Sequence, residues 1–202
     1  MKLYFTPGAC SLSPHIAIRE LGLDVEFEAV NLGTKVTATG ENFKSANPKG
    51  YVPALLLDNG ELLTEGAVIV QLLADLKPEA GLIPKPGTLE RYRVQEWLNF
   101  IATELHKGFS PLYNPKCPDE WKTVVHANLI ARFGIVEERL SKGDYLMGEK
   151  FTVADAYLYT ILTWAPWVKL DLSSFTHIPA FVARVAARPA VQSTHAFEKA
   201  AR

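Results

Sequence analysis

The stretch KLYFTPGACSLSP, residues 2–14, joins a strand-like segment to the start of a helix. Pro7-Gly8 ends the apolar strand signal, and a helix-like run continues to Leu21. Cys10 lies in the turn between the two elements. A thiol at this place is close to the positive end of the helix dipole, which favours the reactive thiolate. The alternative is a small buried apolar residue, because free cysteine is among the most buried residue types.

Around this turn, the first 77 residues alternate strand and helix signals. Asp58-Asn59-Gly60 separates two apolar runs and predicts a tight hairpin, because Asn-Gly readily adopts positive φ angles. The polar segment 33–50 predicts a loop with one short helix. The order predicts a mixed four-stranded sheet with a parallel first pair, an antiparallel hairpin and helices on both faces. The expected strands are 2–5, 25–30, 53–57 and 61–63, and the expected helices are 14–21 and 67–76.

The rest of the chain carries no convincing strand signal. Residues 77–87 contain three prolines and two glycines, which is typical of a linker. Beyond the linker, one helical face is expected through Leu89, Arg93, Trp97, Ile101 and Leu105. Further helices are expected at 119–140, 154–164, 179–187 and 189–199, with the very apolar helix 154–164 at the centre. The chain is therefore predicted to be α/β plus all-α, with domains at 1–78 and 88–202.

Residues 151–156, FTVADA, predict a capping box at the start of the central helix. Thr152 is the expected N-cap, and the Asp155 carboxylate lies three residues later, where it can reach back to the Thr152 amide. Phe151 and Ala156 are placed to pack as a hydrophobic staple. The alternative is that Asp155 is a carboxylate of a functional site, and the capping role is the better supported of the two.

Composition excludes several classes of function. The chain has 202 residues and a formal net charge of -1, so it lacks the basic balance expected of a nucleic-acid partner. No apolar run approaches the roughly 18 residues of a membrane span, and no signal peptide is expected. The two cysteines, Cys10 and Cys117, are far apart and lack metal-ligand spacing. We therefore expect no disulfide framework, no metal site and a cytoplasmic location.

A mixed β-α-β-β-β-α unit with Cys10-x-x-Ser13 after the first strand resembles the thioredoxin fold in its glutaredoxin-like members. With Tyr51-Val52-Pro53, Thr64-Glu65-Gly66 and an all-α second domain that carries the capping box, the chain resembles the cytosolic glutathione S-transferases. Three further motifs resemble the bacterial beta class of that family: residues 9–15, Asn47-Pro48-Lys49-Gly50 and His106-Lys107. The resemblance covers essentially the whole chain.

The resemblance implies a glutathione site in the first domain. Val52 would pair its backbone with the cysteinyl part of glutathione, next to a cis bond to Pro53. Glu65 would face the ligand's ammonium group, and the Gly66 N–H its γ-glutamyl carboxylate. The family usually has serine where Gly66 stands, so one hydroxyl contact is missing. Lys35 would approach the glycyl carboxylate. Taken alone, Pro53, Glu65 and Lys35 also fit a strand start, a first-turn acid and a solvated loop lysine.

The resemblance also assigns roles in the second domain. His106 matches the beta-class histidine that faces Cys10, and it would hold a thiolate or donate to bound sulfur. Asn99 and Glu104 would lie near the interdomain and dimer clefts. Candidates for an apolar substrate wall are Phe109, Tyr113, Trp164 and Trp167, although aromatic residues at helical spacing are more often core. The implied partners are glutathione as co-substrate, with no other cofactor, a small hydrophobic electrophile and a second copy of the chain.

Three functions are compatible with these residues. In a glutathione transferase, the glutathione thiolate attacks an electrophilic carbon. In a glutaredoxin-like oxidoreductase, Cys10 forms a mixed disulfide with glutathione. A ligand-binding protein without catalysis is the third. Tyr4 and Ser11 are alternative hydroxyls for activating glutathione, although Tyr4 is expected to pack inside its strand. His15 is expected to support the turn.

Overall fold

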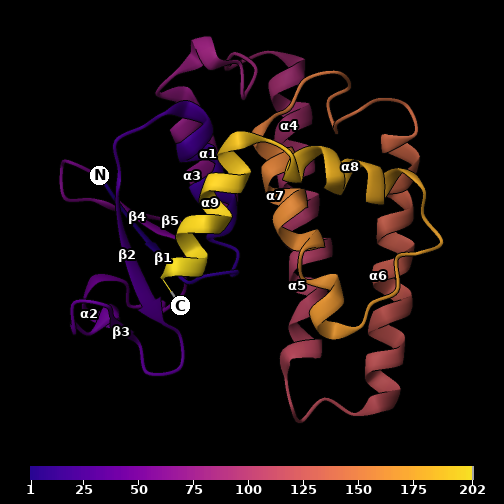
Figure 1. Cartoon of the computed structure of the whole chain (residues 1–202), viewed down its shortest axis with the longest axis horizontal. Helices are drawn as coiled ribbons and strands as arrows, with labels where there is room; N and C mark the ends of the chain where they lie inside the picture. The colour runs from indigo at the N-terminus through magenta and orange to yellow at the C-terminus, as the bar shows by residue number, and fades with distance from the viewer. Residues whose placement is uncertain (202) are drawn as a thin grey trace. The chain divides into compact units, whose positions relative to one another are not determined.

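The computed structural model describes residues 1–201, and the chain forms two compact units (Figure 1). The first unit contains residues 1–83 together with 187–202, and the second contains residues 84–186. In the described residues, no helix is both long and apolar enough to cross a membrane. Each unit is described by itself below.

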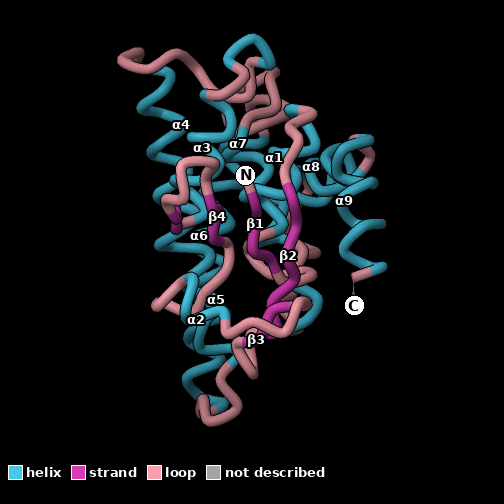
Figure 2. The backbone as a smooth tube through the Cα atoms, turned by 90° about the vertical axis from the view of Figure 1, so that its left-hand side faces the viewer, coloured by secondary structure: helices cyan, strands magenta, loops and turns pink. Residues whose placement is uncertain are grey.

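The first unit is built on a five-stranded mixed sheet in the order β3-β2-β1-β4-β5 (Figure 2). Strand β1 runs parallel to β2, and the other pairs are antiparallel, so the expected parallel pair and hairpin are confirmed. The strands are β1 Lys2–Phe5, β2 Glu26–Asn31, β3 Val36–Thr37, β4 Ala54–Leu56 and β5 Leu62–Thr64.

The two-residue strand β3 lies in the segment that was expected to be a loop. It pairs with the end of β2, where Thr37 stands opposite Val30. The buried Glu28 side chain holds the following turn, because its Oε1 accepts from both the N–H and the hydroxyl of Thr39 at 3.0 Å. Two residues are too short for a periodic signal, so the expected four-stranded sheet lacked this strand.

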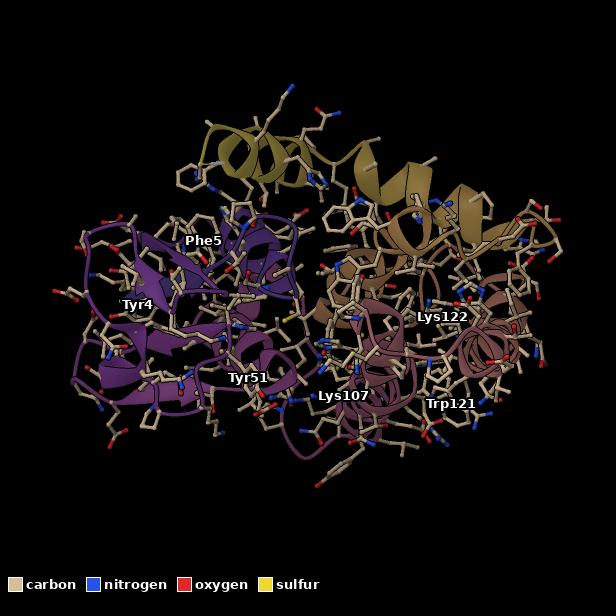
Figure 3. The ribbon with its side chains drawn as sticks, turned by 90° about the horizontal axis from the view of Figure 1, so that it is seen from below. Tyr4, Phe5, Tyr51, Lys107, Trp121 and Lys122 are labelled. Atoms are coloured by element: carbon tan, nitrogen blue, oxygen red, sulfur yellow. The ribbon has the colours of Figure 1, made fainter. Side chains whose placement is uncertain are left out.

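Helices cover both faces of the sheet, as expected. Phe43 of the short helix α2 contacts the Tyr4 ring on one face, with ring centroids 5.2 Å apart. On the other face, Phe5 contacts His15 of α1. Figure 3 labels Tyr4 and Phe5 among the strands of this unit. The helices are α1 Leu12–Leu21, α2 Phe43–Ala46, α3 Gly66–Asp75 and α9 Pro189–Ala200, with a 3₁₀ turn at Pro78–Ala80.

Helix α9 packs beside α1 in the first unit, although the sequence pattern placed it in the second domain (Figure 1, yellow). Two contacts attach it. Arg188 forms a two-bond ion pair with Glu20 of α1, and the Glu198 carboxylate accepts from the Gly8 N–H at 2.8 Å. The repeat of apolar residues shows that α9 buries one face, but it does not show which unit covers that face.

The second unit is all-helical, as predicted. Helix α7 is buried along its whole length and contacts α4 and α8, which confirms its expected central place. The elements are α4 Leu89–Phe100, a π-helix Ile101–His106, α5 Lys107–Phe109, a 3₁₀ helix Ser110–Tyr113, α6 Asp119–Leu140, α7 Val153–Leu162, a 3₁₀ helix Ala165–Val168 and α8 His177–Ala186.

The buried face of α4 differs from the expected one. Leu89 and Arg93 are exposed, whereas Val94 and Leu98 are buried in line with Ile101 and Leu105. A strict spacing of four residues drifts around a helix of 3.6 residues per turn, so Leu89 and Arg93 lie off the core side while Ile101 and Leu105 of the expected face are buried. The sequence also showed no sign that α4 widens into a π-helix at Ile101.

The capping box at α7 is present as predicted. The Asp155 carboxylate accepts from the N–H and the hydroxyl of Thr152, both at 2.8 Å, and from the Leu146 N–H at 2.8 Å. Asp155 is completely buried, and burial raises the pKa of its carboxyl from 3.8 to about 6, against the opposing effect of its hydrogen bonds. Asp155 therefore joins the start of α7 to the preceding loop.

Candidate functional site

Cys10 lies in the loop between β1 and α1, and hydrogen bonds between Thr6 and Ser11 close this loop. Thr6 donates its N–H to Ser11 Oγ at 3.1 Å, and the Ser11 hydroxyl donates back to the Thr6 carbonyl at 3.2 Å. Ser11 is fully buried, and the Tyr4 ring packs in the core of the first unit. Tyr4 and Ser11 are the two alternative hydroxyls for activating glutathione, and both have structural contacts. The expected packing of Tyr4 is confirmed.

The Cys10 side chain lies against Val52. Its Sγ donates to the Val52 carbonyl at 3.1 Å, and the thiol is partly exposed and not in a disulfide. The Val52–Pro53 bond is cis, as the family resemblance implied. The fold therefore brings two of the predicted site residues together over a separation of 42 positions.

Glu65 lies at the start of α3 with an uncommon backbone conformation. Its φ is 73°, a value that a non-glycine residue adopts only when its surroundings hold it there. Its carbonyl accepts from the N–H groups of Val68 and Ile69, both at 2.9 Å, and so begins the helix. The carboxylate is mostly exposed and lies 3.5 Å from Lys49 Nζ. Strained residues of this kind concentrate at functional sites, which supports a binding role for Glu65.

Gly66 is the first residue of α3 and lies beside the cis-proline. A side-chain Cβ built on Gly66 would lie 3.5 Å from Pro53 Cγ and 3.9 Å from Ser13 Oγ. Both distances are ordinary van der Waals contacts, so this position has room for a small side chain. The N-terminus of α3, Pro53 and the turn after Cys10 are therefore neighbours within the first unit.

Lys35 reaches the segment that leads to Val52. Its Nζ donates to the Gly50 carbonyl at 2.9 Å and lies 5.7 Å from the centre of the Tyr51 ring. Its backbone has a φ of 60°, so the residue stands in a second constrained turn. The first unit thus contributes the predicted residues Cys10, Lys35, Val52, Pro53, Glu65 and Gly66 from three loops and one helix start, whereas Asn99 and His106 belong to the second unit.

Glu198 is a site-supporting residue that the sequence did not indicate. Its Oε2 accepts from the Gly8 N–H in the Cys10 loop, and its Oε1 lies 3.0 Å from His15 Nδ1. Burial lowers the pKa of His15, and the Glu198 carboxylate opposes that effect. His15 therefore supports the turn, as expected, but through a partner 183 positions away. Lys49, beside Glu65, was also missed, although it belongs to the quoted Asn47–Gly50 motif.

His106 ends the π-helix of the second unit and has a defined environment there. Its Nδ1 lies 2.7 Å from the hydroxyl of Tyr157 in α7, and its ring meets Trp164 edge to face at 4.9 Å between centroids. Segments of π-helix are frequent at functional sites. The imidazole is thus held by two aromatic side chains that the sequence reasoning did not connect to it.

The remaining candidates of the second unit have separate environments. Glu104 pairs with Arg132 of α6 at 2.7 Å, and Asn99 is exposed on α4. Phe109 is completely buried against Phe133 and Trp164, so it belongs to the core. Tyr113 and Trp167 are about half exposed, and burial raises the pKa of Tyr113 to about 12.

Comparison with known proteins shows the family to which the chain belongs. Residues 8–76 match the glutathione S-transferase N-terminal domain, and residues 100–189 match the glutathione S-transferase C-terminal domain. The chain is 50% identical over 192 residues to glutathione S-transferase GstA of Escherichia coli O157:H7, which covers 95% of this chain and 96% of the relative. The chain belongs to the glutathione S-transferase family.

Solved structures of glutathione S-transferases agree over the whole chain. The ternary complex of BphK, a bacterial member, has a TM-score of 0.97 at 51% identity and covers 98% of this chain and 100% of its own. The bacterial beta-class glutathione S-transferase of Sphingomonas chungbukensis has a TM-score of 0.94 at 42% identity and covers 98% of each chain. The predicted fold class, family and enzyme class are confirmed.

Proposed function

We propose that this glutathione S-transferase conjugates the glutathione thiol to small hydrophobic electrophiles, with Cys10 at the glutathione sulfur. The observation that carries the proposal is the meeting of Cys10, Val52, Pro53 and Gly66 in one unit of a chain that belongs to this family. Glutathione is the co-substrate, and no other cofactor is proposed.

In this proposal, each end of glutathione has its own partner. The Val52 backbone pairs with the cysteinyl part, and Lys35 serves the glycyl carboxylate. Glu65 serves the ammonium group, and the Gly66 N–H at the start of α3 serves the γ-glutamyl carboxylate. Lys49, 3.5 Å from Glu65, adds a positive charge at the same end.

The second unit, in this proposal, supplies the chemistry beyond binding. His106 acts on the glutathione sulfur, and exposed aromatic side chains such as Tyr113 and Trp167 contact the apolar electrophile. We retain Asn99 of α4 as a residue near the ligand, and Glu104 of the following π-helix as a residue near the clefts. The assignment of His106 and Asn99 is supported by the family resemblance.

Purified protein is expected to conjugate glutathione to a chlorinated nitroaromatic compound, with turnover that depends on both substrates. The absorbance of the thioether product measures the rate, and a reaction without protein is the control. A lack of conjugation with a broad panel of electrophiles, including epoxides and unsaturated carbonyl compounds, would contradict the proposal.

Gly66→Ser is expected to lower the KM for glutathione about fivefold, because one added hydroxyl contact contributes roughly 1 kcal/mol. The space beside Pro53 accepts the new Cβ without a clash. The value of kcat is expected to stay unchanged, since the contact is made equally before and during the reaction. Gly66→Ala is the matched control, because it adds the Cβ without the hydroxyl. An equal KM for the two variants would show that a hydroxyl here makes no contact with glutathione.

A second candidate function is glutathione-dependent thiol–disulfide exchange. It is favoured by the partly exposed Cys10 thiol, which is in no disulfide and lies just before α1, in a Cys-x-x-Ser turn without a resolving cysteine nearby in the sequence. Cys10 would attack the sulfur of a glutathionylated substrate and release the substrate thiolate. A second glutathione would then attack the mixed disulfide and leave as oxidised glutathione.

We further propose a cytoplasmic homodimer, in which the first domain of one copy contacts the second domain of the other. Large apolar side chains are exposed in both units, with Tyr51 70% exposed in the first and Leu89 66% exposed in the second. The two free cysteines fit a reducing compartment. Light scattering during size-exclusion chromatography measures the mass, and a monomer mass at micromolar concentration would contradict the dimer.

A further inference from the structure

We infer that Tyr157 is a positioning residue that fixes the tautomer of His106, so that the imidazole carries its proton on Nε2. The inference deepens the proposed function, because it rests on the assignment of His106 to the glutathione sulfur. It is carried by the 2.7 Å distance between His106 Nδ1 and the Tyr157 hydroxyl. Both residues lie within the second unit.

The direction of this hydrogen bond follows from the chemistry of its two groups. A phenol hydroxyl is a stronger donor than a neutral imidazole N–H, and an unprotonated ring nitrogen is a stronger acceptor than a phenol oxygen. The favoured arrangement therefore has Tyr157 donating to Nδ1. A neutral imidazole then carries its single proton on Nε2.

The surroundings keep this geometry in place. Tyr157 is 3% exposed and belongs to α7, the fully buried helix of the unit. Trp164 meets the His106 ring edge to face, which restricts its rotation. The partner of a functional histidine commonly orients it and fixes its tautomer in this way.

The consequence is a specific chemical role for His106. A neutral ring with its proton on Nε2 presents a hydrogen-bond donor to a ligand, so it would stabilise a sulfur anion. It would not present a lone pair on that nitrogen to remove the thiol proton. Tyr157 therefore decides whether His106 acts as a donor or as a base, without touching the sulfur itself.

NMR spectroscopy of protein labelled with ¹⁵N in its five histidines tests the assignment directly. His106→Gln identifies the His106 signals by their loss. In the wild-type protein without glutathione, at a pH where the ring is neutral, Nε2 is expected in the protonated range and Nδ1 in the unprotonated range. Tyr157→Phe is expected to give a mixture of both tautomers. A wild-type ring protonated mainly on Nδ1, or a tautomer unchanged in Tyr157→Phe, would overturn the inference.

Kinetics supplies the second measurement. Tyr157→Phe is expected to lower kcat about five- to tenfold while the KM for glutathione changes less than about twofold, because a lost orienting hydrogen bond acts on the reaction more than on binding. Tyr159→Phe is the matched control: it removes a phenol hydroxyl from the same buried helix, and its kcat is expected to stay close to the wild-type value. An equal fall of kcat in both variants would overturn a role specific to Tyr157.

The two proposals fail in distinguishable ways. The NMR measurement needs no turnover, and its wild-type arm needs no variant to fold. A protein that conjugates nothing but holds the proton on Nε2 would contradict the proposed function and support the tautomer. Normal conjugation with the proton on Nδ1 would support the function and overturn the role of Tyr157.

Discussion

Cys10→Ala is expected to abolish glutathione-dependent disulfide reduction, with a loss of more than about a thousandfold, and to leave conjugation within about tenfold of the wild-type rate. Disulfide exchange needs the Cys10 sulfur as its nucleophile, so nothing in the variant can replace it. Conjugation uses the sulfur of glutathione itself, and the variant loses at most one hydrogen bond to that sulfur. The two rates, measured on one preparation with a glutathionylated peptide and a chlorinated nitroaromatic, separate the two candidate functions.

Cys117→Ala is the matched control for this experiment. Cys117 is buried, and its Sγ lies 3.7 Å from the Pro118 carbonyl in the second unit. Both activities are expected to stay at the wild-type level. Mass spectrometry of the intact protein after treatment with oxidised glutathione adds a direct readout, with the adduct expected on Cys10 and lost in Cys10→Ala.

Two outcomes would change the assignment of Cys10. Disulfide reduction that survives in Cys10→Ala would show that another group is the nucleophile. A conjugation rate that falls as far as the reduction rate would show that the thiol takes part in both reactions. The second result would replace the view that Cys10 only holds glutathione during conjugation.

Asp155→Ala is expected to lower the free energy of unfolding by about 3 kcal/mol or more at neutral pH. The change leaves the N–H groups of Leu146 and Thr152 and the Thr152 hydroxyl without their acceptor, at a completely buried place. Unsatisfied buried donors cost about 1–3 kcal/mol each, and the loss of an N-cap partner adds to that cost. Urea denaturation at a fixed protein concentration measures the change.

Glu138→Ala is the control for removing a carboxylate from the same unit. Its partner is Lys142 one helical turn away, and both side chains are well exposed. Exposed pairs of this kind contribute little to stability, so the unfolding midpoint is expected to stay almost unchanged. An equal effect of the two substitutions would contradict the capping role of Asp155.

The Asp155 carboxyl makes the free energy of unfolding depend on pH, and the sign of this dependence follows from its pKa. Its pKa in the folded protein, about 6, is above its ordinary value of 3.8 because of burial. Between these two values the folded state holds a proton that the unfolded state has released, so the contribution of Asp155 to stability falls as the pH rises through that range. The contribution is largest below the ordinary pKa. Glu28 is buried and Glu137 is partly exposed, and in both the hydrogen bonds outweigh the effect of desolvation and lower the pKa, which gives those carboxyls the opposite slope.

The difference between wild type and Asp155→Asn isolates this effect. The other carboxyls are common to both proteins, so their pH dependence cancels in the difference. The stability advantage of the wild type over the variant is expected to shrink by about 2 kcal/mol between pH 4 and pH 6. A difference that grows over this range would show that the hydrogen bonds to Asp155 outweigh its burial.

Local signals predicted most of the elements. Strand β1 and helix α6 have the expected bounds, the Asn59-Gly60 hairpin is present, and the capping box forms at α7. Each of these depends on neighbours within a few residues, such as a turn, a cap or an apolar period. Strand β3 and the π-helix were missed, because two residues carry no period and a widened helix keeps the composition of an ordinary one.

The candidate site was predictable only in part, for a similar reason. Family motifs indicated Cys10, Val52 and Glu65, and the structure brings Cys10 and Val52 into contact. Glu198 contacts His15 across 183 positions and Tyr157 contacts His106 across 51, and single side chains at such separations leave no pattern in the sequence. These contacts are formed by tertiary packing alone.

The return of α9 to the first unit has a consequence for synthesis of the protein. A ribosome releases residues 1–83 long before residues 187–202, yet the two segments form one unit. His15 is completely buried in the finished unit and has its carboxylate partner on α9, so the nascent first segment lacks both that cover and that bond. The Gly8 N–H in the Cys10 loop also lacks its acceptor until Glu198 has been made. The loop that carries the thiol therefore gains this contact only after Glu198 has been translated.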